Sequence, residues 1–210
     1  NPIWYAVQAL PVVGNPQQDD AFSWAAAYYA QALAQKIVEL NPQIQTVFDT
    51  WRKQGVKKET LWSELEQNPD LKNLLLAETP WLAEAASEQE QQQRIGLLFD
   101  LNAMKYRMEQ AVTKLSSLQK SDGSWSWFGG MVGSRMVTTQ VTELLARLKS
   151  MQVMGEVRVS DMYLKALNYL EAAFCEEYRQ LKEYESKKNG VQLPSELAVR
   201  YLYIVSLDKA

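Results

Sequence analysis

The stretch LLFDLNAMKYRMEQAVTKLSSL at residues 97–118 decides the fold class of this 210-residue chain. Apolar residues recur along it at alternating spacings of four and three, which is the period of one face of an α-helix. This stripe consists of Leu97, Leu101, Met104, Met108, Ala111, Leu115 and Leu118. We therefore predict a long amphipathic helix here.

The same period continues toward the N-terminus. After an opening segment broken by Pro11, Gly14 and Pro16, Asp19-Asp20 caps a helix that ends at Asn41-Pro42. Its predicted stripe is Phe22, Ala26, Tyr29, Leu33, Ile37 and Leu40. A second helix is predicted over 42–55, and shorter helical pieces over 59–67 and 69–76.

Helices are also predicted after residue 134. One has the stripe Val137, Val141, Leu144, Leu148 and Met151. After a connector over 155–159, Ser160-Asp161 caps a helix striped by Tyr163, Leu167, Leu170, Phe174, Tyr178, Leu181 and Tyr184, which Asn189-Gly190 closes. Pro194-Ser195 starts a last helix through Leu197, Tyr201, Ile204 and Val205.

No convincing period-two run bounded by turns appears, so we predict an all-α fold of antiparallel helical hairpins joined by short turns. We expect residues 1–210 to form a single helical domain excised from a larger multi-domain protein.

Composition excludes several classes of function. A net charge of -3 supplies no electrostatic drive for nucleic-acid binding. There is no histidine, and Cys175 is the single cysteine, so the sequence offers no zinc pattern and no intrachain disulfide. No apolar run is long enough to span a membrane. We expect no cofactor, no metal, no nucleic-acid partner and no direct membrane insertion by this segment.

The most distinctive segment is LQKSDGSWSWFGG at residues 118–130. Asp122-Gly123 predicts a turn in which Gly123 takes a positive φ, and Trp125, Trp127 and Phe128 follow. One interpretation is a loop that stacks aromatic rings on a ligand. The other, which we favour, is a structural staple in which Gln119 bonds to the turn backbone and Trp125 packs under the next helical hairpin.

The spacing Gln119, Gly123, Trp125 resembles the QW-type repeat (Gln-x-x-x-Gly-x-Trp) of the α/α toroid superfamily. That superfamily includes terpenoid cyclases, prenyltransferase subunits and the thioester domains of complement and alpha-2-macroglobulin. The run from Gln119 to Arg135 is similar to bacterial alpha-2-macroglobulins in particular, and so is the start of the chain. The resemblance implies an α/α toroid, complete or partial.

Members that bear a thioester carry Cys-x-Glu-Gln after a proline, and the run NPIWYAVQALP at residues 1–11 resembles that region. Tyr5 then falls at the position of the cysteine, Val7 at that of the glutamate and Gln8 at that of the glutamine. A thioester needs a thiol sulfur to attack the glutaminyl carbonyl, and a tyrosine supplies none. We therefore expect no enzyme activity and no covalent capture. Cys175 is expected to be a packed or half-exposed structural residue, because the adjacent acids Glu176 and Glu177 disfavour a thiolate.

By resemblance, the parent is a bacterial envelope protein of the periplasm that inhibits an endopeptidase or defends the cell without covalent attachment. Its partners would be other domains of the same chain and, through the whole protein, proteases. If the toroid is partial, Tyr201, Ile204 and Val205 of the last helix would lack cover and favour self-association.

Two other interpretations stay open. A carbohydrate-active α/α toroid enzyme would combine the tryptophan-rich loop with a carboxylate pair, formed by Asp19-Asp20 with Asp100 or Asp122. A helical-repeat interaction module with no link to proteases is the third.

Overall fold

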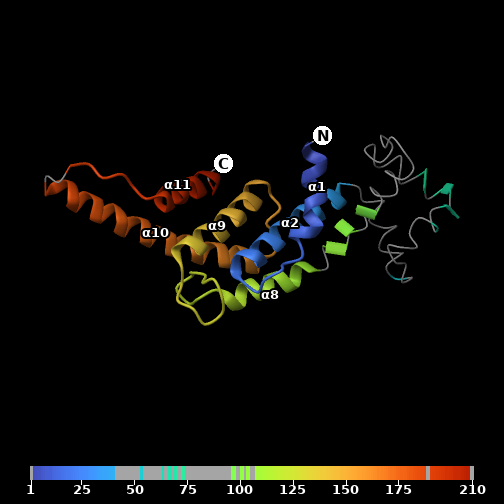
Figure 1. Ribbon diagram of the computed structural model, residues 1–210, viewed down its shortest axis with the longest axis horizontal. Helices are drawn as coiled ribbons and strands as arrows, with labels where there is room; N and C mark the ends of the chain where they lie inside the picture. Colours follow the sequence, from blue (N-terminus) through green and yellow to red (C-terminus); the bar gives the residue numbers. More distant parts are fainter. Residues whose placement is uncertain are drawn as a thin grey trace.

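A computed structural model describes residues 2–40, 107–187 and 190–208, together with residues 53, 63, 66–67, 69–70, 72–73, 96–97, 100–101 and 103–104. Every regular element in these parts of the chain is a helix, so the fold is all-α, as predicted (Figure 1). The helix predicted over 42–55 lies outside the described residues except at residue 53, and the pieces over 59–67 and 69–76 are described only in part.

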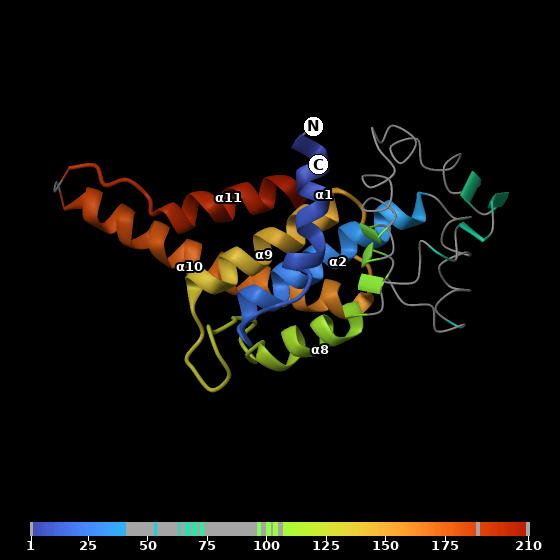
Figure 2. The same cartoon turned by 45° about the vertical axis from the view of Figure 1, so that its right-hand side comes forward.

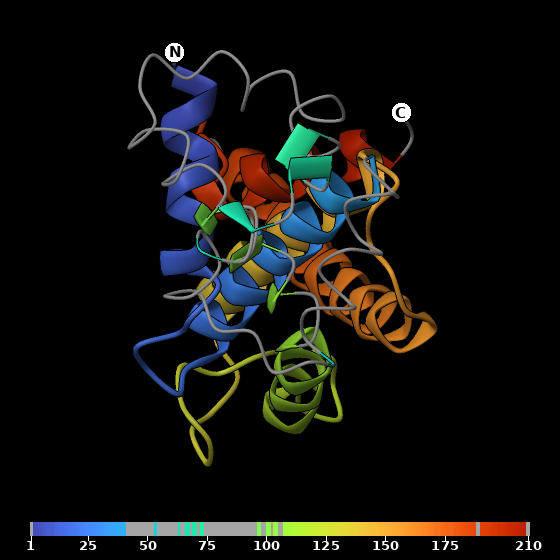
Figure 3. The same cartoon turned by 90° about the vertical axis from the view of Figure 1, so that its right-hand side faces the viewer.

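Six helices are described in full. They are α1 (Pro2–Val13), α2 (Ala21–Glu39), α8 (Met108–Leu118), α9 (Arg135–Ser150), α10 (Val157–Ser186) and α11 (Glu196–Asp208). Helix α2 packs against α1, α8 and α9, while α9 also packs against α10 and α11 (Figures 2 and 3). Helices α2 and α9 therefore form the centre of the described bundle.

Helix α1 replaces the broken opening segment that the sequence predicted. Pro11 lies inside it, close to its C-terminal end. A proline so near the end of a helix removes one backbone hydrogen bond and leaves the preceding turns intact. The Gly14 N–H then donates to the Leu10 carbonyl at 2.7 Å, and the Gln31 side-chain amide donates to the Gly14 carbonyl at 2.9 Å, which fixes the exit from α1 against α2.

Helix α2 begins as predicted but buries a different face. Asp20 is its N-cap and accepts from the Ser23 N–H at 2.9 Å. The predicted stripe is wrong at both ends, since Phe22 and Leu40 are exposed, whereas Trp24 and Tyr28 are buried. Helices pack on several sides of α2, and its buried alanines let those neighbours approach closely.

The stripe that leads into and through α8 is confirmed. Leu97, Leu101, Met104, Ala111 and Leu115 are all buried. In α9, Val137, Val141 and Leu148 are buried as predicted, and Leu145 is buried as well. Leu144 is only half-buried, and Met151, the C-cap residue after α9, is exposed, contrary to prediction.

Helix α10 starts earlier than predicted. It begins at Val157, with Glu156 in the N-cap position, rather than after a cap at Ser160-Asp161. Its buried residues lie between Val159 and Leu170, whereas Tyr178 and Tyr184 of the predicted stripe are exposed. The C-terminal half of α10 therefore extends beyond the core, accompanied by the segment that leads into α11 (Figure 1).

Helix α11 is capped as predicted, because the Ser195 hydroxyl accepts from the Ala198 N–H at 3.2 Å. The expectation that Ile204 lacks cover is wrong, since Ile204 is fully buried where α11 packs on α9. Tyr201 and Val205 are half-buried. The uncovered apolar residues of α11 are instead Val199, Leu202 and Tyr203.

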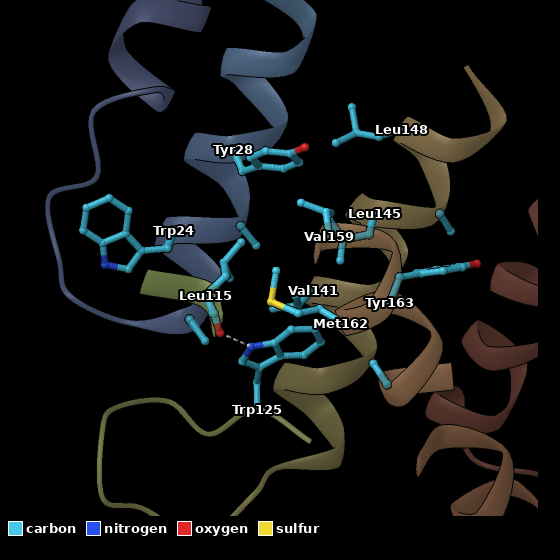
Figure 4. Packing of buried hydrophobic residues seen from close by; sticks show 14 of the residues in the cluster. Trp24, Tyr28, Leu115, Trp125, Val141, Leu145, Leu148, Val159, Met162 and Tyr163 are labelled. Carbon is cyan, nitrogen blue, oxygen red and sulfur yellow. Dashed lines mark hydrogen bonds between the residues drawn. The ribbon is translucent and has the colours of Figure 1, made fainter. Parts of the chain in front are cut away.

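The core lies between α2, α8, α9 and the first half of α10 (Figure 4). Trp125, Tyr28 and Tyr163 are the largest fully buried side chains among the described residues. The Tyr28 hydroxyl donates to the Met154 carbonyl, which ties α2 to the connector between α9 and α10. Burial raises the pKa of the Tyr28 phenol to about 12, and the charge of Glu156 adds to this, so the hydroxyl stays protonated at neutral pH.

Candidate functional site

The loop between α8 and α9 begins with a tight turn. Gln119 ends α8 in an extended conformation and forms an isolated bridge with Trp125. Lys120 donates to the Ser124 carbonyl at 2.8 Å, and Gly123 donates to the Lys120 carbonyl at 3.0 Å. Gly123 has the predicted positive φ, at 88°, and a Cβ built there would lie 2.2 Å from the Lys165 carbonyl oxygen. Glycine is required at this position both by conformation and by the closeness of α10.

The Gln119 side chain joins this turn to α10. Its amide nitrogen donates to the Gly123 carbonyl at 3.1 Å and to the Met162 carbonyl at 2.8 Å. One amide group therefore holds the turn closed and fixes it against the first part of α10.

Trp125 inserts into the core from the other arm of the turn (Figure 4). Its side chain is 0% exposed, and the indole N–H donates to the Leu115 carbonyl at 2.9 Å. Its backbone N–H donates to the Thr138 hydroxyl at 2.8 Å, and its carbonyl accepts from the Ser134 N–H at 2.8 Å. The indole thus bonds to α8 while the backbone bonds to the start of α9. Together with Gln119, it holds three helices in place, which is the arrangement of a staple.

Asp122 bonds within the same turn. Its carboxylate accepts from the Ser124 hydroxyl at 2.7 Å and from the Ser124 N–H at 3.0 Å. These hydrogen bonds, the one from the hydroxyl most of all, lower the pKa of the Asp122 carboxyl. The carboxylate stabilises the turn in its charged form.

Trp127 and Phe128 differ from Trp125 in their burial. They are 40% and 47% exposed, so of the three aromatic residues that follow the turn only Trp125 is buried. The Trp127 carbonyl accepts from the Ala21 N–H at 3.2 Å, which positions the loop against the start of α2.

Tyr5, Val7 and Gln8, the residues aligned with a thioester motif in the sequence analysis, all lie in α1. Val7 is half-buried, and the side chains of Tyr5 and Gln8 lie outside the described part of the structure. Cys175 lies on α10 and is exposed, whereas the sequence predicted a packed or half-exposed residue. Helix α10 packs against α8, α9 and α11, and α1 packs against α2.

The carboxylates considered for catalysis have structural partners. Asp20 caps α2, and Asp19 accepts from the Trp24 indole at 2.6 Å and from the Lys114 ammonium at 2.9 Å. Hydrogen bonds from Lys114 and then from Trp24 lower the pKa of Asp19. A general acid for glycoside hydrolysis needs a raised pKa, and both Asp19 and Asp122 are shifted in the opposite direction. Asp100 is half-buried.

Sequence reasoning missed an ionic cluster that joins three helices. Arg135, at the start of α9, pairs with Glu177 of α10 at 2.6 Å. Glu177 also accepts from the Ser195 N–H at 2.6 Å and from its hydroxyl at 2.9 Å. Burial, the largest single effect, raises the pKa of Glu177, but the hydrogen bonds from Ser195 and Arg135 together outweigh it and lower the pKa. The only sequence signal was the cap at Ser195, since contacts between residues 42 positions apart have no local period.

A groove lies beside this ionic cluster, and the sequence did not predict it. The groove has a volume of about 310 Å³ and lies between the second half of α10, residues 191–194 and α11. Its lining is mainly apolar and includes Phe174, Leu181, Val191, Leu193, Ala198 and Leu202.

Among the described residues no cluster of acids and cysteine is arranged to hold a metal ion. None of the described helices combines the length and apolar character needed to cross a bilayer. Comparison of the chain with protein-family models, with curated proteins and with solved structures finds no match.

Proposed function

We propose that this chain is a non-catalytic, thioester-domain-like helical domain of a bacterial alpha-2-macroglobulin-like envelope protein. The parent would act as an endopeptidase inhibitor or periplasmic defence protein without covalent capture. Within this proposal the described helices belong to antiparallel hairpins of an α/α toroid, complete or partial. The single observation that supports it most is the role of Gln119 and Trp125, which bond to α10, α8 and α9 and serve packing rather than chemistry.

The position of the single cysteine also supports a domain without a thioester. A thioester requires a cysteine near a glutamine, and the chain's one cysteine lies on α10, 167 positions after Gln8 (175 − 8). Glu176, the neighbour of Cys175 in α10, accepts hydrogen bonds from Arg179 and Gln180 that lower its pKa to about 2, so Cys175 lies next to a negative charge.

The partners proposed are the other domains of the parent chain, with proteases met by the whole protein in the periplasm or cell envelope. The net charge of -3 gives no reason to add nucleic acid to that set.

The full-length parent tests this proposal. We expect a serine endopeptidase incubated with it to be restrained without forming an adduct that survives boiling in dodecyl sulfate. A covalent adduct would contradict the non-covalent mechanism. Coding sequence around this chain that lacks an export signal would contradict the assignment to an envelope protein.

A carbohydrate-active enzyme is the second candidate, because exposed Trp127 and Phe128 offer ring faces on which sugars stack. It ranks second because the pKa values of Asp19 and Asp122 are both lowered. Hydrolysis of an oligosaccharide panel that is lost in Asp122→Asn would favour it over the first proposal.

A further inference from the structure

The tip of the loop between α8 and α9 is an unusually apolar surface. We define the tip as residues 127–132, WFGGMV. Trp127, Phe128 and Met131 are each 40% to 49% exposed and Val132 is 90% exposed. No charged residue occurs from Gly123 to Ser134. Exposed apolar side chains gathered in this way mark an interaction surface.

The tip is also held in one shape before any partner arrives. Trp125 and Ser134 anchor its two ends in the core. The Phe128 carbonyl accepts from the Met131 N–H within the tip at 3.3 Å and from the hydroxyl of Ser126, which precedes the tip, at 2.8 Å. A preformed aromatic loop loses little conformational entropy on binding, so its apolar area contributes to affinity with small cost.

The groove between α10 and α11 offers the complementary surface. Its apolar walls include Val191 and Leu193, which are 83% and 82% exposed, and Leu202. Each charged side chain that lines it, within the described part of the chain, is paired. Lys182 bonds to Glu185 at 2.9 Å, and Glu177 bonds to Arg135 and Ser195. An uncharged segment can bind in this groove without desolvating an unpaired charge. A charged segment would lose its own hydration on binding there.

The tip does not reach the groove of its own chain. It projects from the side of the bundle away from α11 in all three views (Figures 1, 2 and 3). The groove lies on the α11 side of α10, so a tip seated in it comes from another molecule.

We propose that the chain self-associates head to tail, with the tip of one copy seated in the α10–α11 groove of a second copy. Because the two surfaces differ, a dimer leaves one tip and one groove open, and larger assemblies grow from it. One loop in one groove is at the small end of interface sizes, so association occurs at high protein concentration.

Sedimentation velocity over a micromolar to millimolar series tests this. We expect the weight-average sedimentation coefficient of the wild type to rise beyond the dimer. Trp127→Ser removes the tip and Leu202→Glu puts a charge in the groove, and each weakens association at least about tenfold. Met151→Ser, an exposed apolar residue at the other end of α9, is the matched control and leaves association unchanged. Far-UV circular dichroism confirms that each variant folds.

The decisive experiment is sedimentation of a mixture of the two variants. Trp127→Ser keeps an intact groove and Leu202→Glu keeps an intact tip, so an equimolar mixture restores one contact and stops at the dimer. A monomeric wild type at all concentrations would overturn the proposal. So would a mixture that stays monomeric, or equal weakening by Met151→Ser. Binding of the tip to phosphatidylcholine vesicles without self-association would assign it to a lipid surface instead and also overturn it.

Discussion

Replacing Trp125 with alanine tests the staple quantitatively. The side chain is fully buried, and a buried tryptophan truncated to alanine costs about 3–5 kcal/mol. The lost indole hydrogen bond adds about 1 kcal/mol. No carbonyl is orphaned, because the Leu115 oxygen keeps its bond from the Gln119 N–H at 3.1 Å. We therefore expect a loss of about 4–6 kcal/mol in the free energy of unfolding.

Urea unfolding followed by far-UV circular dichroism measures this loss without interference from the seven tryptophans. With a denaturant slope of roughly 2–3 kcal/mol per molar, the midpoint falls by roughly 2 M. Trp125→Phe, which keeps most of the ring contacts, costs about 1–2 kcal/mol. Trp127→Ala, on a half-exposed ring of the same loop, is the matched control and costs about 1 kcal/mol or less.

The result that would refute the staple is a loss for Trp125→Ala no larger than that for Trp127→Ala. If stability stayed at the wild-type level while binding to a ligand disappeared, the loop would be a ligand-stacking site.

Three further predictions concern the turn, the ionic cluster and the cysteine. Gly123→Ala, whose Cβ would lie 2.2 Å from the Lys165 oxygen, lowers the free energy of unfolding by about 2–3 kcal/mol. Gly130→Ala, with a similar φ of 81° and open space around it, lowers it by only about 1 kcal/mol. Equal losses for the two variants in urea unfolding would contradict the close approach of the turn to α10. Because the folded-state pKa of Glu177 is lowered, its stabilisation is present above its ordinary value of 4.5 and is lost as the pH falls through the lowered value. Glu177→Gln should therefore be less stable than the wild type at pH 7 and show a flatter loss below pH 4.5, and an unchanged acid slope would argue against the cluster. Cys175 should react with iodoacetamide in the native protein with no change in helical signal, and a need for denaturant would mean that it is buried.

Local patterns in the sequence predicted the elements whose determinants are close along the chain. The stripe through Leu101 and Leu115, the cap at Asp20, the cap at Ser195 and the positive φ of Gly123 each depend on residues within a few positions. Helical periodicity and turn chemistry are local, so they can be read directly.

Features set by tertiary packing could not be predicted in this way. Helix α2 has neighbours on several sides, so its large apolar residues do not mark a single buried face, and Phe22 is exposed while Tyr28 is buried. The pairing of Arg135 with Glu177 joins distant parts of the chain. The groove follows from how far α10 extends beyond the core. The sequence predicted a helix of about this length, but its apolar stripe continues through Tyr178 and Tyr184 and so does not show that these turns leave the core.

We propose above all that this helical chain holds no thioester. Intact-mass spectrometry before and after incubation with methylamine tests it most directly, because an amine opens a thioester and adds to the glutaminyl carbonyl. We predict an unchanged mass and a single free thiol, that of Cys175, both before and after treatment. A gain of one methylamine at Gln8, with a new thiol appearing, would contradict it.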